Sequence, residues 1–145
     1  MIFDEIYKNN NLISINEATV ARGNKMAIGV DPDYDRNYGN IAYFKVYNNS
    51  NPKAASEVIR LHFYDNGYEA HKGKPLFKMK KRDREELMKL LISPPTAAKF
   101  EKCSTAWKAL IMEFNSVVKP QFILPDDLIM PDYTKIIFKE DIWNK

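Results

Sequence analysis

The sequence predicts an α+β fold in which a largely antiparallel sheet of three to five strands packs against two consecutive helices. Two observations carry this prediction. Residues 40–64 contain two runs rich in aromatic and β-branched residues, each bounded by turn residues. Residues 80–117 then switch to the three- and four-residue apolar spacing of amphipathic helices. The chain is expected to form one domain, 1–145, long enough to bury a core without metals or disulfides.

The two clearest strands are predicted over 40–48 and 56–64. In the second run Ile59, Leu61 and Phe63 alternate with basic and aromatic residues, so one face is apolar and the other is amphipathic. Weaker patterns predict a short helix or arm over 1–8 and strands over 11–18, 25–30 and 134–143.

The stretch Asp65-Asn66-Gly67 is typical of a tight turn. Residues 68–79 are therefore expected to return antiparallel and to form a hairpin with the preceding strand. In that strand Lys72 and Lys74 share one face, and Pro75 has to lie at an edge or in a loop because it lacks an N–H donor.

The first helix is predicted over 80–92, with Leu87, Leu90 and Leu91 facing inward. Pro94 and Pro95 end it. Thr96 is expected to cap a longer second helix, whose apolar stripe contains Phe100, Cys103, Trp107, Leu110, Phe114 and Val117. Pro120, Pro125 and Pro131 make the segment that follows extended.

Composition narrows the class of protein. Apolar residues make up 45% and charged residues 28% of the chain, and the net charge is only +3. Cys103 is the only cysteine, so no internal disulfide is expected. The N-terminus has no signal-peptide pattern, and no stretch approaches the ~18 apolar residues of a membrane span. We expect a cytoplasmic protein without a membrane partner, and the bias toward Lys, Asn, Ile, Tyr and Phe is typical of low-GC bacteria and their phages.

The stretch GVDPDYDRNYGN, residues 29–40, places acidic residues at every other position. Asp31, Asp33 and Asp35 match three calcium-loop positions. However, Arg36 and Ala42 occupy the positions that need glycine and a bidentate glutamate. The stretch is therefore interpreted as a hairpin turn whose carboxylates lie on a solvated tip.

A longer stretch, residues 27–46, also resembles the opening hairpin of RNase H-like resolvases: a strand, then Asp31, a glycine-containing loop and a second strand. The resemblance covers about twenty residues. It implies a magnesium-dependent nuclease in which Asp31 binds the metal, with further carboxylates supplied by later elements. The candidates for these are Glu69, Glu113, Asp126 and Asp127.

A basic segment follows the predicted hairpin turn. Seven positive side chains accompany one acid, Asp83, within residues 71–84: Lys72, Lys74, Lys78, Lys80, Lys81, Arg82 and Arg84. One interpretation is a positive potential that holds phosphates or an acidic patch of a partner. The other is a solvated strand edge that runs into a helix whose Glu85 and Glu86 partly neutralise it.

The amphipathic sheet face is the second candidate surface. It would combine the rings of Tyr43, Tyr47, Tyr64 and Tyr68 with the basic side chains of Lys45, Arg60 and His62. Such a face can stack unpaired bases. Alternatively, a helix or the C-terminal tail covers it and the tyrosines are core. Neither His62 nor His71 has an acidic residue at ligand spacing, so no metal or acid–base pair is expected there.

No GxSxG, GxGxxG or phosphate-loop pattern is present, and no catalytic residue, metal or cofactor is expected. The sequence predicts a non-catalytic protein that binds a macromolecular partner through the basic segment and the amphipathic strand face. A protein target is favoured, as for small phage or mobile-element proteins that inhibit or adapt host machinery. Binding of single-stranded or structured nucleic acid is the alternative, and the magnesium nuclease is the third. A homodimer is left open, because an uncovered aromatic face or edge strand would favour one.

Overall fold

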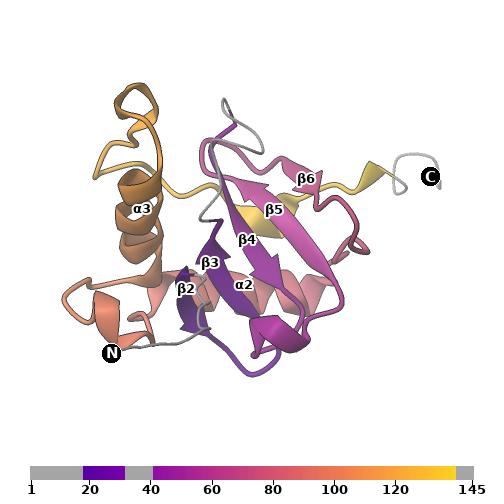
Figure 1. Ribbon diagram of the computed structural model, residues 1–145. Helices are drawn as coiled ribbons and strands as arrows, with labels where there is room; N and C mark the ends of the chain where they lie inside the picture. The colour runs from indigo at the N-terminus through magenta and orange to yellow at the C-terminus, as the bar shows by residue number, and fades with distance from the viewer. Residues whose placement is uncertain (1–17, 32–40, 140–145) are drawn as a thin grey trace, which may run out of the picture.

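The computed structural model describes residues 18–31 and 41–139, and these form an antiparallel sheet with helices on one face (Figure 1). Neighbouring strands in the sheet are also neighbours in the chain, in the order β2-β3-β4-β5-β6. Their bounds are Ala18–Arg22, Ala27–Val30, Tyr43–Tyr47, Val58–His62 and Tyr68–Ala70. The predicted α+β class with an antiparallel sheet is confirmed.

The central pair β4–β5 fixes which side chains face the helices. Phe44 lies opposite Leu61, and Val46 lies opposite Ile59. All four are fully buried, because antiparallel partners point to the same face and this face meets the helices. The alternation of apolar residues in these two strands therefore predicted the core face correctly.

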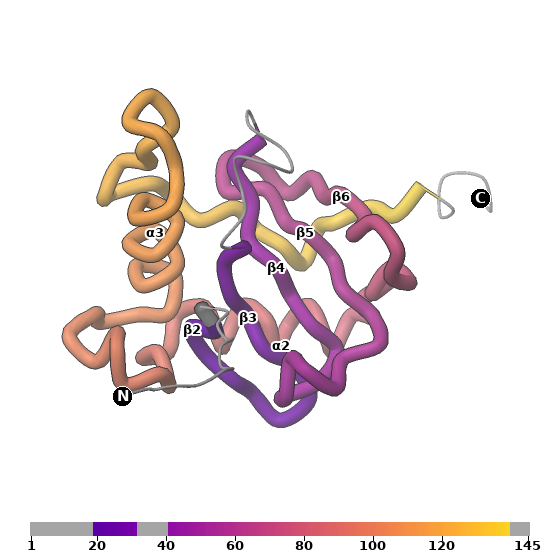
Figure 2. Tube along the Cα trace, in the orientation of Figure 1, coloured from indigo at the N-terminus to yellow at the C-terminus, as the bar shows by residue number. Residues whose placement is uncertain are grey.

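Two helices close this face: α2 (Lys81–Ile92) and α3 (Ala106–Val117). In Figures 1 and 2, α2 crosses behind the sheet, and α3 stands at the side where β2 lies. Rings interlock where α3 meets the sheet. The centre of the Phe44 ring lies 5.2 Å from the centre of the Phe63 ring and 6.2 Å from that of Trp107, which it meets edge-on.

α2 begins close to the predicted position. The backbone N–H of Lys80 donates to the Asp83 carboxylate at 2.9 Å, which places a negative charge at the positive end of the helix. Leu87, Leu90 and Leu91 are buried as predicted. The helix ends at Ile92, two residues before Pro94.

The predicted start of the second helix at Thr96 is wrong. Thr96 pairs instead with the outer edge of β2: its N–H donates to the Val20 carbonyl, and its hydroxyl accepts from the Arg22 N–H at 2.9 Å. Thr105 is the residue that caps α3, because its hydroxyl accepts from the Lys108 N–H at 3.2 Å. Between them the chain makes a 3-10 helix, Ala98–Phe100. Cys103 therefore precedes α3 and is half-buried, rather than lying on a helical stripe.

The C-terminal segment is extended, as the prolines predicted, apart from the 3-10 helices Pro120–Phe122 and Tyr133–Lys135. It passes behind the sheet and runs toward β6 (Figure 2). The strand predicted over 134–143 is wrong for the described residues 134–139, which pair with no strand.

The remaining strand predictions are partly confirmed. The strand predicted over 25–30 corresponds to β3, while β2 begins at the last residue of the one predicted over 11–18. Residues 1–17 and 32–40 lie outside the described residues, and with them the predicted arm and most of the predicted hairpin turn. In the part of the chain that the structure describes, no helix has the length and apolarity needed to cross a bilayer.

Candidate functional site

The basic segment forms an exposed, positively charged surface. Six of its side chains are exposed, and we call them the basic surface: Lys72, Lys74, Lys78, Lys80, Lys81 and Arg82. The first two lie in the turn after β6, the next two in the extended stretch that follows, and the last two in the first turn of α2.

The turn differs from the predicted strand. The expectation that Lys72 and Lys74 share one face of a hairpin strand is wrong, because β6 ends at Ala70. The Lys74 N–H donates to the His71 carbonyl at 3.1 Å, and Gly73 adopts φ 82°, a conformation that glycine adopts without strain. The chain then returns to the sheet edge, where Leu76 bridges to Val58. The two lysines therefore project from a tight turn.

The start of α2 adds to the positive potential. The exposed N–H groups of a helix N-terminus already carry a partial positive charge, and Lys80, Lys81 and Arg82 lie at this end. Because a negative charge is favoured at this end of a helix, these cations oppose the helix dipole. Asp83 offsets part of this, and a bound anion would offset more.

Arg84, the seventh cation of the segment, has a structural contact. Its Nη1 donates to the Ile136 carbonyl at 2.8 Å and fixes the C-terminal segment against α2. The next residue, Ile137, is 61% exposed. The segment is also held to β6, because the Lys139 N–H donates to the Tyr68 hydroxyl at 3.1 Å. An exposed apolar side chain, Ile137, therefore directly follows the residue that Arg84 holds.

The amphipathic strand face is not an exposed surface at its centre. Tyr43, Lys45, Tyr47 and Arg60 are each less than a tenth exposed. These four residues are therefore buried, as expected if the tyrosines are core, but α3 packs against the opposite face, that of Phe44. Only Tyr64, in the loop after β5, stays largely exposed.

Asp31 belongs to this buried face. The Tyr43 hydroxyl donates to its Oδ2 at 2.9 Å, and the Lys45 Nζ lies 3.5 Å from the same oxygen. The guanidinium of Arg60 lies 5.1 Å from the centre of the Tyr43 ring. The expectation that this carboxylate lies on a solvated tip is wrong for Asp31, while Asp33 and Asp35 lie outside the described residues.

The carboxylates that the nuclease resemblance would need do not meet Asp31. Glu69 contacts His62, and Glu113 pairs with Lys99 at 2.9 Å. Asp126 and Asp127 are exposed in the C-terminal segment. Among the described residues, no three or more histidine, cysteine, aspartate or glutamate side chains are grouped so as to hold a metal ion.

His71 lies at the margin of the same buried cluster. Burial of the imidazole, helped by the positive charges of Lys45 and Arg60, holds the pKa of His71 below its usual value of 6.5. The Lys72 carbonyl and Asp31 act in the opposite direction and are outweighed.

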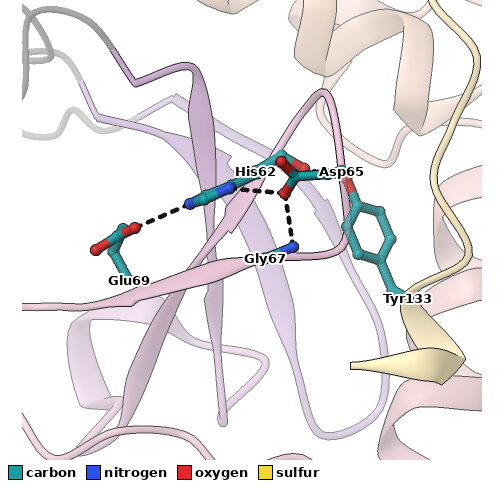
Figure 3. A network of polar contacts seen from close by, with 5 residues as sticks. All are labelled: His62, Asp65, Gly67, Glu69 and Tyr133. Carbon is teal, nitrogen blue, oxygen red and sulfur yellow. Dashed lines mark hydrogen bonds and ion pairs between the residues drawn. The ribbon is translucent and has the colours of Figure 1, made fainter. Parts of the chain in front are cut away.

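His62 has two acidic partners that sequence spacing did not suggest. Its Nδ1 lies 2.8 Å from Asp65 Oδ1, and its Nε2 lies 3.0 Å from Glu69 Oε2. Figure 3 shows the ring between the two carboxylates, with the Gly67 N–H also on Asp65 and the Tyr133 hydroxyl reaching the His62 backbone. The sequence feature that could have indicated the contact between His62 and Glu69 is the tight turn at Asp65–Gly67. This turn fixes a register in which the two residues are diagonal neighbours on one face.

This network clamps the end of the β5–β6 hairpin. Only an imidazolium can donate to both carboxylates at once, since a neutral ring has one N–H. Partial burial raises the pKa of Asp65, but hydrogen bonds from the Gly67 N–H and from His62 outweigh it and hold the pKa below its usual value of 3.8. The carboxylates lie on opposite sides of the ring (Figure 3), so they do not converge on one point where a metal could bind.

A cavity of about 370 Å³ lies beside α3, and Cys103 is part of its lining. Its lining is residues 98–103 and Met112. Lys99 at its edge is held by the buried Glu113. The residues that line the cavity include the Glu101 carboxylate and two lysines but no histidine, so no His–Cys pair is formed there.

Comparison of the chain with protein-family models, with curated proteins and with solved structures finds no match.

Proposed function

We propose that the protein is a non-catalytic binding protein, which engages an acidic patch of a partner protein through the basic surface. The observation that carries this proposal is the exposure of six cations within eleven consecutive residues, 72–82. Their concentration at one turn and one helix N-terminus attracts carboxylates and steers association.

An exposed apolar side chain in the segment that Arg84 holds against α2 favours a protein partner. Protein interfaces combine an apolar anchor with a polar, charged rim. Ile137 is exposed next to Ile136, which Arg84 holds against α2. A phosphate backbone offers no apolar pocket to such a side chain.

Burial of the amphipathic strand face weakens the support for single-stranded nucleic acid. That alternative depended on tyrosine rings that stack bases. Tyr43 and Tyr47 are buried, and the exposed Tyr64 alone does not make a stacking platform. Nucleic-acid binding then depends on charge alone, which would be unspecific and strongly dependent on salt.

Affinity capture with matched charge variants tests the proposal. The test variant carries Lys74→Glu, Lys80→Glu, Lys81→Glu and Arg82→Glu. Three of these changes place acids at the N-terminus of α2, where they are favoured by the helix dipole, and circular dichroism checks that the variant is folded. The control variant has the same net charge but carries Lys25→Glu, Lys53→Glu, Lys108→Glu and Lys119→Glu, all at exposed positions.

Each protein is immobilised and exposed to extract of the source cell, with and without nuclease treatment, and bound proteins are identified by mass spectrometry. We expect one protein or a small set to bind the wild type and the control variant, to be lost with the test variant, and to be insensitive to nuclease. Equal capture by all three proteins would contradict the proposal. Capture only in untreated extract would favour the nucleic-acid alternative.

A further inference from the structure

A second exposed feature lies in the C-terminal segment, over residues 124–132, which we call the acidic loop. α3 holds it at two points. The Asn115 side chain both donates to the Leu124 carbonyl, at 3.0 Å, and accepts from the Leu124 N–H, at 2.8 Å. The Trp107 Nε1 donates to the Leu128 carbonyl at 3.0 Å. The loop backbone is therefore fixed before any partner binds.

The fixed loop presents one highly exposed apolar side chain with aspartates before and after it in the chain. Ile129 is 85% exposed, the most exposed of the large hydrophobic residues in the described part of the chain. The carboxylates of Asp126, Asp127 and Asp132 are exposed on either side of it. Hydrogen bonds from the Thr134 hydroxyl and N–H hold the pKa of Asp132 below its usual value, so that it stays ionised at neutral pH.

An ordered loop of this kind is suited to docking. Its backbone pays little conformational entropy on binding, because α3 already holds it. A protruding isoleucine gains free energy when a partner removes it from water. The flanking carboxylates require that the receiving surface be positive.

The chain itself carries a surface of that chemistry. The basic surface supplies six exposed cations, and the exposed Ile137 follows the residue that Arg84, in the same turn of α2, holds. We propose that the acidic loop of one molecule docks on the basic surface of a second copy of this chain.

The contact is between different patches, so the assembly is head-to-tail. In one molecule the acidic loop is fixed to α3, whereas the basic surface lies on the turn after β6 and on α2. After one contact forms, each end of the dimer still presents an unused patch of opposite charge. Association therefore continues beyond a dimer unless the rotation closes a ring.

This inference rests on the proposed function, because it uses the same basic surface. It adds a form of regulation: a second copy and the acidic partner compete for the same cations. Dilution or excess partner then releases the basic surface.

Sedimentation velocity over a range of protein concentrations tests the inference on the full chain. We expect the weight-average mass to rise with concentration at about 0.01 M salt. The rise should be much smaller at about 0.15 M salt, where the Debye length falls from about 30 Å to about 8 Å. A wild-type protein that stays monomeric at low salt over the whole range would overturn the inference.

Two isoleucine variants distinguish specific docking from nonspecific hydrophobic association. Ile129→Ser should raise the apparent dissociation constant about tenfold, because the apolar contact is lost. Ile92→Ser is the matched control, since Ile92 is also exposed but lies at the end of α2, outside the acidic loop. An equal effect of the two substitutions would argue against docking through the loop.

A charge swap gives the sharpest result. Asp126→Lys/Asp127→Lys and Lys80→Glu/Lys81→Glu should each remove self-association alone. Their equimolar mixture should recover it, because each variant supplies the patch that the other lacks. The aspartate variant keeps the basic surface, so it should still capture the acidic partner. Failure of the mixture to associate overturns the inference. If only Lys80→Glu/Lys81→Glu also loses capture of the acidic partner, the proposed function still stands.

Discussion

Lys45 and Arg60 lie directly opposite each other on β4 and β5, and both are buried. Like charges in a cross-strand pair repel each other. Asp31 and the Tyr43 ring offset the repulsion, since the first lies 3.5 Å from the Lys45 Nζ and the second lies beneath the Arg60 guanidinium. At this scale the arrangement stabilises the fold and keeps these cations away from a partner.

Replacement of Asp31 distinguishes this role from that of a metal ligand. Asp31→Asn keeps the shape but leaves Lys45 without its negative neighbour, so we expect a loss of about 3 kcal/mol in the free energy of unfolding. Urea denaturation followed by circular dichroism measures it. A variant of unchanged or increased stability would contradict this role, and loss of a divalent-dependent cleavage would support the nuclease resemblance.

His71 gives the fold a dependence on pH. Its pKa is lower in the folded than in the unfolded chain, so the unfolded chain binds more protons between the two values. Stability should therefore fall as the pH is lowered from 7 through about 6.5 and below. Urea denaturation at a series of pH values should show this slope in the wild type and a smaller one in His71→Gln. An identical slope in both proteins would contradict the assignment.

At the scale of elements, two threonines with the same chemistry have different roles. Thr96 hydrogen-bonds with β2, 74 positions earlier in the chain, whereas Thr105 caps α3. A capping motif alone could not separate them, because the decisive contact of Thr96 is with a strand distant in sequence. The prediction that Lys72 and Lys74 lie on a strand was wrong for a similar reason. The turn at Gly73 depends on the return of the chain to Val58, which is distant in sequence.

Alanine substitution separates the two roles. Thr105→Ala removes the cap of α3 and should cost about 1 kcal/mol of unfolding free energy. Thr96→Ala removes one exposed hydrogen bond at the edge of β2 and should cost less, about 0.5 kcal/mol. Chemical denaturation of the two variants gives both values, and the reverse order would mean that the helix begins at Thr96.

At the scale of the whole molecule, the periodic apolar patterns predicted which faces of the sheet and of α2 are buried. The alternation of Phe44, Val46, Ile59 and Leu61 placed the sheet face correctly, and the leucines of α2 placed its buried side. Burial of Lys45 and Arg60 could not be predicted, because lysine and arginine are normally exposed and their partners come from other strands. The basic surface was visible in the sequence as a run of charge, but only its exposure separates it from the structural cation Arg84.

Site-specific photo-crosslinking tests the central claim, that the basic surface contacts an acidic protein, most directly. A photoreactive amino acid replaces Lys81 on the basic surface or, as the control, Lys108 on the exposed side of α3. We predict a covalent adduct with a partner protein from position 81, suppressed by Lys80→Glu/Arg82→Glu, and none from position 108. Adducts of equal yield from both positions, or adducts with nucleic acid alone, would contradict it.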